Sequence, residues 1–262
     1  MIPVIGTLIV NGVHWLERLI ESVDYPVDEF FIINNNGRDQ ITAELDALAS
    51  KKHKFINKIK VTHLPCNFGC SGGWNLIIKC YMMKPYWMIV NHDIAFTPGL
   101  LKAMHEKATT GTGGLVFASI NNGNTKFSNH GSWDLFLIKD WVVQSHGLFD
   151  ENLYPAYSED MDYIMRLRSS PLKIDSVEMP YLHGEEDYEK SGSQTMRTEP
   201  SLKPLIEKTT ILNEGEYLSK KWGSNWFLAD SKTHKFPFND QANPIDYFSY
   251  DLSFVRKKYM GF

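Results

Sequence analysis

The chain has 262 residues, of which 43% are hydrophobic and 22% charged, so it can bury a sizeable core without disulfide bonds or a structural metal. Its formal net charge is −4 and it has no long run of Lys or Arg, which argues against a nucleic-acid partner. The three cysteines, Cys66, Cys70 and Cys80, do not suggest a disulfide framework, so a reducing compartment is expected.

The sequence gives no sign of membrane insertion. No segment reaches the about 20 apolar residues that a membrane-spanning helix needs. The apolar segment 1–12 lacks the basic region and cleavage site of a signal peptide, and it predicts a first buried strand instead. We therefore expect a soluble, cytoplasmic protein, with peripheral contact to a membrane left open.

The first half of the chain alternates short apolar runs with segments of helical periodicity. The expected strands are Val4–Val10, Phe30–Ile33, Val61–Leu64, Tyr86–Val90 and Leu115–Ser119. The expected helices follow Gly12, follow a cap at Asp39, span Gly72–Met83 and open near Pro98. This alternation predicts an α/β fold with a mostly parallel sheet and helices on both faces. Ligands bind such sheets beyond the carboxyl ends of the strands, where polar clusters occur in this sequence. These clusters are Asn11-Gly12, Asn34–Asp39, Asn67–Asn75 and Asn91–Asp93.

The second half of the chain is less regular. The expected elements are a strand at Leu135–Ile138, helices at Lys139–Ser145 and Glu159–Arg168, and an extended segment at Val177–His183. From about residue 185 onward the composition becomes polar and aromatic. The aromatic residues of this extension are interpreted as packing residues, with stacking on sugar rings as the alternative.

Two acidic segments are candidates for chemistry. Asn91-His92-Asp93 directly follows a buried strand, and its oxygen atoms suit Mg²⁺ or Mn²⁺, although an Asx turn would explain it equally simply. Glu159, Asp160 and Asp162 begin a predicted helix, where acidic residues complement the helix dipole. Their clustering also allows one carboxylate to have a raised pKa and to act as a general base.

Two further segments are weaker signals. His183 follows an extended run and is either a hydrogen-bonded structural residue or an additional metal ligand. Asn67–Asn75 is a glycine-rich turn that leads into a helix and could bring backbone N–H groups close to an anion. Its glycine spacing is not that of a dinucleotide-binding turn, and simple helix entry is the alternative.

Taken in order, these segments resemble family 2 glycosyltransferases with the GT-A fold, in particular the rhamnosyltransferase-like branch. The similarity extends from about Ile2 to Gly184. Ile32–Asp39 looks like the family's nucleotide-base segment, Asn67–Asn75 like its N-x-G-x-x-x-G-x-N turn, Asn91–Asp93 like its D-x-D or N-x-D metal motif, Leu148–Glu151 with Glu159–Asp162 like its FDE…ED-x-D stretch, and Tyr181–His183 like its late metal-binding His.

The resemblance implies an inverting, metal-dependent transfer of a sugar from a UDP-, dTDP- or GDP-sugar to a hydroxyl of a glycan or other acceptor. Mn²⁺ or Mg²⁺ would be held by Asp93 and His183, with Asn91 as a further ligand. Asp160 would be the base, with Glu159 or Asp162 as rivals. The implied donor-binding residues are Thr7, Asn11, Asn34, Asp39, Asn67, Gly72, Gly73, Asn75 and His92.

The resemblance also divides the chain. Residues 1–184 would form the catalytic domain, with a nucleotide-binding half at about 1–97 and an acceptor half at about 98–184. Residues 185–262 would form a helical and aromatic extension packed on that domain. Two other functions stay open at this point: a sugar nucleotidyltransferase, and a catalytically silent carbohydrate- or nucleotide-binding protein on the same scaffold.

Overall fold

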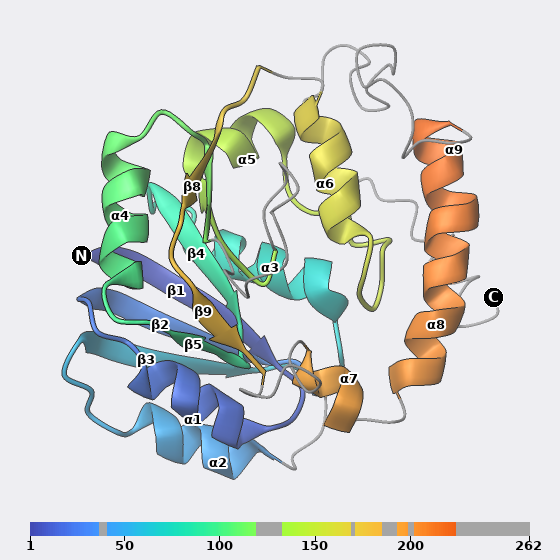
Figure 1. Cartoon of the computed structure of the whole chain (residues 1–262). Coiled ribbons are helices and arrows are strands. Elements are labelled where there is room, and N and C mark those ends of the chain that lie inside the picture. The colour runs from blue at the N-terminus through green and yellow to red at the C-terminus, as the bar shows by residue number, and fades with distance from the viewer. Residues whose placement is uncertain (37–40, 119–132, 169–170, 185–192, 199–201, 224–262) are drawn as a thin grey trace.

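The fold is built around four parallel strands from the first third of the chain. The computed structural model describes residues 1–36, 41–118, 133–168, 171–184, 193–198 and 202–223 (Figure 1). The strands are β1 (Ile2–Ile9), β2 (Val27–Asn34), β3 (Ile56–His63) and β4 (Tyr86–Asn91). They lie in the order β3-β2-β1-β4, so the carboxyl ends of β1 and β4 are adjacent.

Three strands extend this sheet on the other side of β4. They are β7 (Leu135–Lys139), β6 (Leu115–Ala118) and β8 (Ile174–Val177), and they complete the order β3-β2-β1-β4-β7-β6-β8. Only β7 is antiparallel to its neighbours within the described sheet. The seven-stranded, mostly parallel sheet confirms the predicted fold class.

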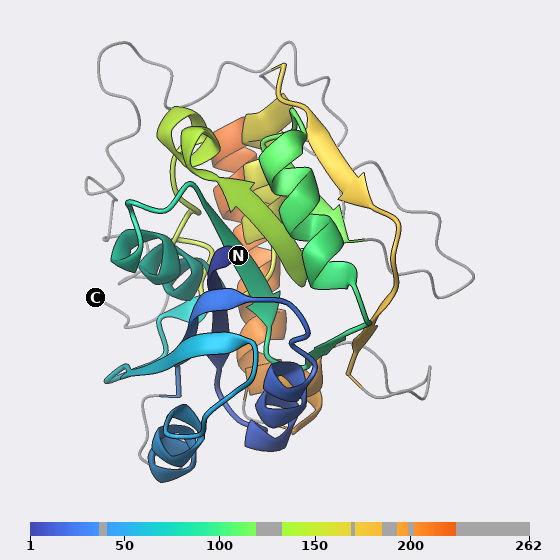
Figure 2. The same cartoon turned by 90° about the vertical axis from the view of Figure 1, so that its left-hand side faces the viewer.

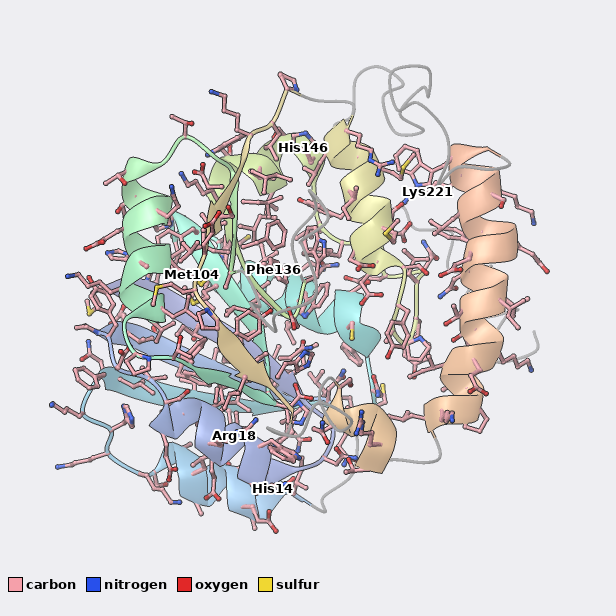
Figure 3. All side chains as sticks on the ribbon, viewed as in Figure 1. His14, Arg18, Met104, Phe136, His146 and Lys221 are labelled. Atoms are coloured by element: carbon pink, nitrogen blue, oxygen red, sulfur yellow. The ribbon has the colours of Figure 1, made fainter. Side chains whose placement is uncertain are left out.

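Helices cover both faces of the sheet, as Figures 1 and 2 show. One face carries α1 (Val13–Glu21), α2 (Thr42–Ala49) and α4 (Leu100–Thr110), and the other carries α3 (Gly69–Cys80), α5 (Asp140–His146) and α6 (Glu159–Arg168). Alternate side chains of each strand enter opposite cores, which is the period-2 pattern of a sheet buried on both sides. Met104 of α4 lies in one core and Phe136 of β7 in the other (Figure 3).

A second sheet of two short strands lies at the carboxyl edge of the large one. It pairs β5 (Ile94–Phe96) with β9 (Tyr181–His183) in antiparallel register, with Ile94 opposite His183. The extended segment predicted over Val177–His183 is divided between the two sheets. β8 ends in the large sheet at Val177 and β9 begins in the small sheet at Tyr181, directly after Pro180, which has no N–H to donate to a ladder.

The described part of the C-terminal extension is helical. It consists of α7 (Gln194–Thr198), α8 (Leu202–Leu212), the π-helical segment η3 (Asn213–Leu218) and α9 (Ser219–Trp222). Trp222 is buried and packs with Leu218, Leu153 and Met165, which agrees with the packing interpretation for this aromatic residue. The packing role is also predicted for aromatic residues that lie outside the described residues: Trp226, Phe236, Phe238, Tyr247 and Phe248. None of the described helices is long and apolar enough to span a bilayer.

The helix expected over Gly72–Met83 is displaced by three residues, to Gly69–Cys80. The Asn67 side-chain oxygen accepts the Gly69 N–H at 2.7 Å, which starts the helix earlier. Within the helix, Gly73 faces β1, and a Cβ at this position would collide with the side chain of Leu8. The glycine therefore allows α3 to pack closely on the sheet.

This packing can be tested with Gly73→Ala. We expect the substitution to lower the free energy of unfolding by about 1–3 kcal/mol, because the added methyl group displaces Leu8. Gly215→Ala is the matched control, since no atom lies within 4 Å of a Cβ built there, and it should be neutral or slightly stabilising. Urea unfolding of both variants measures the difference; equal stabilities would contradict the close-packing role.

Candidate active site

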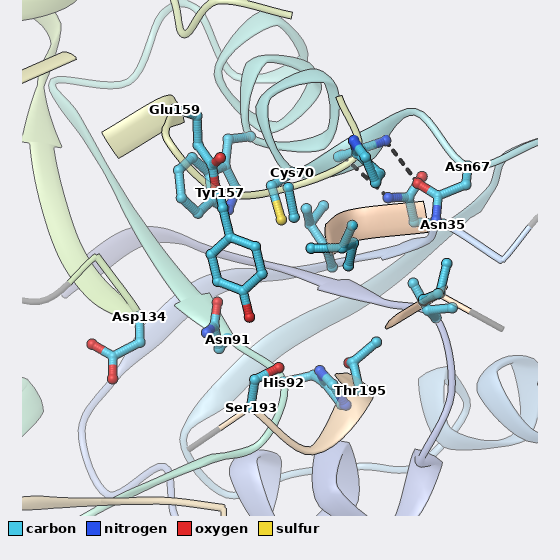
Figure 4. Close-up of a pocket in the computed structure, with 18 of the residues that line it drawn as sticks. Asn35, Asn67, Cys70, Asn91, His92, Asp134, Tyr157, Glu159, Ser193 and Thr195 are labelled. Atoms are coloured by element: carbon cyan, nitrogen blue, oxygen red, sulfur yellow. Dashed lines mark hydrogen bonds between the residues drawn. The ribbon is translucent and has the colours of Figure 1, made fainter. Parts of the chain in front are cut away.

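A cleft of about 290 Å³ opens beyond the carboxyl ends of β1 and β4 (Figure 4). It is bordered by the start of α3, the start of α6, and residues of α7 and α8. Six of the residues predicted from the sequence line it: Asn67, Asn91, His92, Asp93, Glu159 and Asp160. The cleft therefore combines the predicted metal motif and the predicted catalytic carboxylates in one site.

Asp93 and His183 form the centre of the predicted metal site. Asp93 Oδ1 lies 3.4 Å from His183 Nε2, and neither atom has another hydrogen-bond partner among the residues that the structure describes, although both are buried. The Gln194 N–H donates to the other oxygen, Asp93 Oδ2, at 2.7 Å. Despite burial, which acts in the opposite direction, the hydrogen bond to His183 and the nearby imidazoles hold the pKa of Asp93 at about 2.

His183 is oriented by a residue that sequence reasoning missed, Asp134. Asp134 Oδ2 lies 2.7 Å from His183 Nδ1, and the Tyr181 hydroxyl donates to Asp134 Oδ1 at 2.6 Å. Burial disfavours the charged imidazole, but hydrogen bonds to Asp134 and Asp93 outweigh it and raise the pKa of His183 to about 10. A carboxylate on one ring nitrogen directs the other nitrogen toward Asp93, as in histidines that ligate metals.

These residues fit a hard divalent cation. Mg²⁺ and related ions use one or two protein carboxylates and complete their coordination with phosphate oxygens and water. Asp93 Oδ1 and, once it has lost its proton, His183 Nε2 could supply the protein's share, and the side chain of Asn91 lines the same cleft. Within the part of the chain that the structure describes, no group of three or more acidic, His or Cys side chains is arranged to hold a metal ion by itself, so other ligands would come from substrate and solvent.

The loop that carries Asp93 is fixed by Arg18 of α1. Arg18 Nη2 donates to the backbone oxygens of Asp93 and Gly184, at 3.0 and 2.6 Å, and the Gly184 N–H donates to Asp93 O at 2.8 Å. His92, between Asn91 and Asp93, is buried, and burial lowers its pKa, so its imidazole is neutral at pH 7. Within the described part of the chain, its Nε2 has no hydrogen-bond partner.

The acidic start of α6 forms the opposite wall. Glu159 is buried, and burial together with the charge of Asp160 raises its pKa to about 8. Burial also raises the pKa of Asp160, whose Oδ1 accepts the Met161 N–H at 2.8 Å. Tyr157 and Ser158 precede them with φ of 73° each, a left-handed conformation that is uncommon outside glycine and recurs at functional sites. The ring of Tyr157 extends into the cleft (Figure 4).

Asp162, the alternative to Asp160 as the base, has a different role in the structure. It is fully buried, and its Oδ2 accepts hydrogen bonds from Arg166 Nε and Nη2 at 3.0 and 2.6 Å. Its Oδ1 accepts the Trp222 indole N–H at 2.8 Å. Asp162 does not line the cleft, so it has no access to an acceptor hydroxyl there.

Several predicted donor-binding residues lie outside the cleft lining: Thr7, Asn11, Asn34, Gly72, Gly73 and Asn75. Asn75 is buried and binds the backbone of Phe149 through both its side-chain atoms, at 2.8 Å each. Asn34 is directed toward His63, at 3.0 Å. Asn11 accepts the Thr198 hydroxyl at 3.1 Å. Asp39 lies outside the described residues.

Asn35, rather than Asn34, lines the cleft from β2. Its Oδ1 accepts the Phe68 N–H at 2.7 Å and its Nδ2 donates to Gly69 O at 3.2 Å, so it holds the turn that precedes α3 (Figure 4). The strand alternation offered a signal for this difference, because neighbouring residues at the end of a strand point to opposite faces.

Solved structures that share this fold include glycosyltransferases of the GT-A type. The mannosyltransferase PcManGT from Pyrobaculum calidifontis, in complex with GDP-Man and Mn²⁺, superposes with a TM-score of 0.56 at 11% identity over 67% of this chain and 54% of that one. S. aureus TarS 1–349 in complex with UDP-GlcNAc gives 0.56 at 14% identity over 81% and 67%. GalNAc-T7 with UDP, GalNAc and Mn²⁺ gives 0.55 at 12% identity over 68% and 42%.

The sequence itself identifies the family. The profile of Glycosyl transferase family 2 matches residues 8–160, more than half of the chain, so the chain belongs to that family. Comparison with curated proteins gives no significant match. The chain spans little more than half the length of the mannosyltransferase and less than half that of GalNAc-T7.

The raised pKa of Glu159 predicts a pH-dependent cost to stability. Its carboxyl group is neutral in the folded protein up to about pH 8, whereas an unfolded Glu ionises near pH 4.3, so stability is lost as pH rises between these values. Glu159→Gln should therefore stabilise the protein on the order of 1–3 kcal/mol more at pH 8 than at pH 5. Thermal unfolding at both pH values, beside the exposed control Glu207→Gln, measures this; an equal effect at both would contradict it.

Proposed function

We propose that this protein is an inverting, metal-dependent glycosyltransferase that moves a sugar from a nucleoside diphosphate onto a hydroxyl group of a glycan or other acceptor. The observation that carries the proposal is the shared cleft, which is lined by Asp93, with His183 3.4 Å behind it, and by Glu159 and Asp160. Membership of family 2 and the GT-A fold support it. We further propose that residues 1–184 are the catalytic domain and 185–262 its extension.

Asp93 and His183 would hold Mn²⁺ or Mg²⁺, with Asn91 as a further ligand. The bound ion would offset negative charge on the departing nucleoside diphosphate. The described residues of the cleft lining include no Lys or Arg, and His92 is neutral there. This composition favours a divalent cation over cationic side chains as the partner of the diphosphate. Asp134 would keep His183 directed toward Asp93, as it does in the structure.

Asp160 would act as the general base. Its carboxylate accepts the proton of the acceptor hydroxyl while that oxygen bonds to the anomeric carbon, and the bond from this carbon to the diphosphate oxygen breaks on the opposite side. This single displacement inverts the anomeric centre. Glu159, protonated at neutral pH, would donate a hydrogen bond beside it. Burial raises the pKa of both carboxyl groups, which suits proton transfer near neutral pH.

The donor is proposed to be a UDP-, dTDP- or GDP-sugar. The related structures hold GDP-Man, UDP and UDP-GlcNAc. Asn35 and Asn67 would approach the nucleotide from the ends of β2 and β3, and the pocket for the sugar would include Trp74 and Trp133. These apolar rings also suit a deoxyhexosyl group, so a dTDP-rhamnose donor belongs among the candidates.

The proposal is tested with purified protein, Mn²⁺ and a panel of UDP-, GDP- and dTDP-sugars, including dTDP-rhamnose. We expect nucleoside diphosphate release with one donor, and we expect its loss with a chelator and in Asp93→Ala. Asp175→Ala is the control for the general loss of a carboxylate. Asp175 does not line the cleft, and its carboxylate accepts the Gly113 N–H. Calorimetry with the same nucleotides completes the test. The absence of both turnover and metal-dependent binding would refute the proposal, and metal-dependent binding without turnover would indicate a binding protein.

The assignment of the base predicts a specific pH profile. Asp160→Asn should lower kcat by about 10²–10⁴-fold, whereas Glu159→Gln should have a smaller effect. Because burial raises the pKa of Asp160, wild-type activity should fall as pH drops through a value above the ordinary Asp range. Rates of nucleoside diphosphate release between pH 5 and 9 measure both effects. A larger loss in Glu159→Gln than in Asp160→Asn would reverse the two roles.

A further inference from the structure

A buried cluster of four charged side chains connects the C-terminal helix to the start of α6. Lys221 Nζ lies 2.5 Å from Asp150 Oδ2 and 2.7 Å from Asp162 Oδ1. Arg166 binds the second oxygen of Asp162 at 2.6 Å. All four side chains are at most 5% exposed. Figure 3 shows Lys221 between α9 and α6.

Among the four described side chains of this cluster, the second positive charge comes from the later helix, α9. Asp150, Asp162 and Arg166 come from the loop before α6 and from α6 itself, and together they carry an excess negative charge. Lys221 supplies the second positive charge from α9. Removing one partner of a buried ion pair leaves an uncompensated charge, which is strongly destabilising. Asp162 lies two residues after Asp160, so the cluster fixes the turn of helix that carries the proposed base.

A second contact joins the same two elements nearer the cleft. The Ser158 hydroxyl donates to Glu214 Oε1 at 3.0 Å, and the Tyr217 hydroxyl donates to Asp150 Oδ2 at 2.5 Å. Glu214 and Tyr217 belong to the π-helical segment η3, a geometry that often marks functional sites. Ser158 has the left-handed φ of 73°, so a contact from η3 holds an uncommon backbone conformation next to Glu159.

We propose that Lys221 and Glu214 are positioning residues for catalysis, which hold the first turn of α6 so that Asp160 and Glu159 face the cleft. This inference rests on the proposed glycosyltransferase function. Neither residue lines the cleft, so both act through α6 and the residue before it. Lys221 acts through Asp150 and Asp162, and Glu214 acts through Ser158.

Glu214 has an electrostatic effect as well. The charged and titratable groups that influence Asp160 or are influenced by it are Glu159 on the same helix, Cys70 on α3 and Glu214 on η3. Burial is the main cause that raises the pKa of Asp160, and the charge of Glu214, an exposed residue, makes a small contribution in the same direction. A variant that removes the charge of Glu214 but keeps its side-chain oxygen separates the effect on the pKa of Asp160 from the hydrogen bond to Ser158.

The first test is Lys221→Met in the full chain, with Lys221→Arg and the exposed neighbour Lys220→Met for comparison. We expect Lys221→Met to lower kcat about 10- to 100-fold while the KM for the donor stays within about twofold, since the metal pair lies on the opposite wall. Lys221→Arg should restore most of the activity, and Lys220→Met should equal wild type. Wild-type kcat in Lys221→Met would overturn the role of Lys221.

The second test does not depend on the folding of Lys221→Met. Glu214→Gln keeps an oxygen for the Ser158 hydroxyl, so it should retain wild-type thermal stability and shift the acid limb of the kcat profile to lower pH. Glu214→Ala, which removes the acceptor, should also lower kcat. Glu216→Gln, an exposed residue of the same segment, is the control and should change neither. An unchanged acid limb in Glu214→Gln together with unchanged kcat in Glu214→Ala would overturn the role of Glu214.

If Lys221→Met does not fold, Asp150→Asn/Lys221→Met removes a carboxylate together with the cation and keeps the ion pair of Asp162 with Arg166. This variant should fold and still show the lower kcat, and wild-type kcat in it would overturn the positioning role. Turnover by wild-type protein separates a failure of the proposed function from a failure of the positioning role. Its absence with every donor counts against the proposed function, whereas wild-type turnover with unaffected variants counts only against the positioning role.

Discussion

The antiparallel pairing of β5 with β9 is the constraint on which the candidate site depends. Asp93 directly precedes β5 and His183 ends β9, so the register that puts Ile94 opposite His183 also places these two distant residues side by side. Arg18 reinforces this register through the backbone oxygens of Asp93 and Gly184. Since backbone pairing, and not a loop, sets the distance between the two side chains, the proposed metal-binding pair is preorganised before any ligand arrives.

The two walls of the cleft have opposite electrostatic character. At Asp93, an imidazole within 3.4 Å stabilises the ionised carboxylate, so the pKa is about 2. At Glu159, burial beside another carboxylate favours the neutral acid, so the pKa is about 8. A carboxyl group with a low pKa stays ionised at neutral pH, whereas one with a raised pKa can gain and lose a proton there. The proposed roles in cation binding and in proton transfer are therefore assigned to different residues for physical reasons.

The sheet, its helices and the positions of Asp93, Asp160 and His183 were predictable because alternating apolar runs and polar strand ends are local patterns. Asp134 was not, since it precedes its strand. β7 is antiparallel, so its amino end lies beside the carboxyl ends of the parallel strands. A prediction that considers only residues after the carboxyl ends of strands therefore misses Asp134. Gly73 and Asn75 look like ligand-binding residues in sequence, yet their three-dimensional neighbours, Leu8 and Phe149, give them packing roles.

The family profile ends at residue 160, yet the site does not. His183, Ser193, Thr195, Leu202 and Ile206 come from later in the chain, and the last four line the cleft. Gln194 donates its N–H to Asp93, so α7 contacts the metal pair directly. Lys221 and Glu214 act on the other wall through α6 and Ser158. The described C-terminal helices therefore contact both walls and line part of the cleft. Under the proposed function, the matched segment contains Asp93 and Asp160, whereas His183 and the helices that line the rest of the cleft come from the part of the chain beyond it.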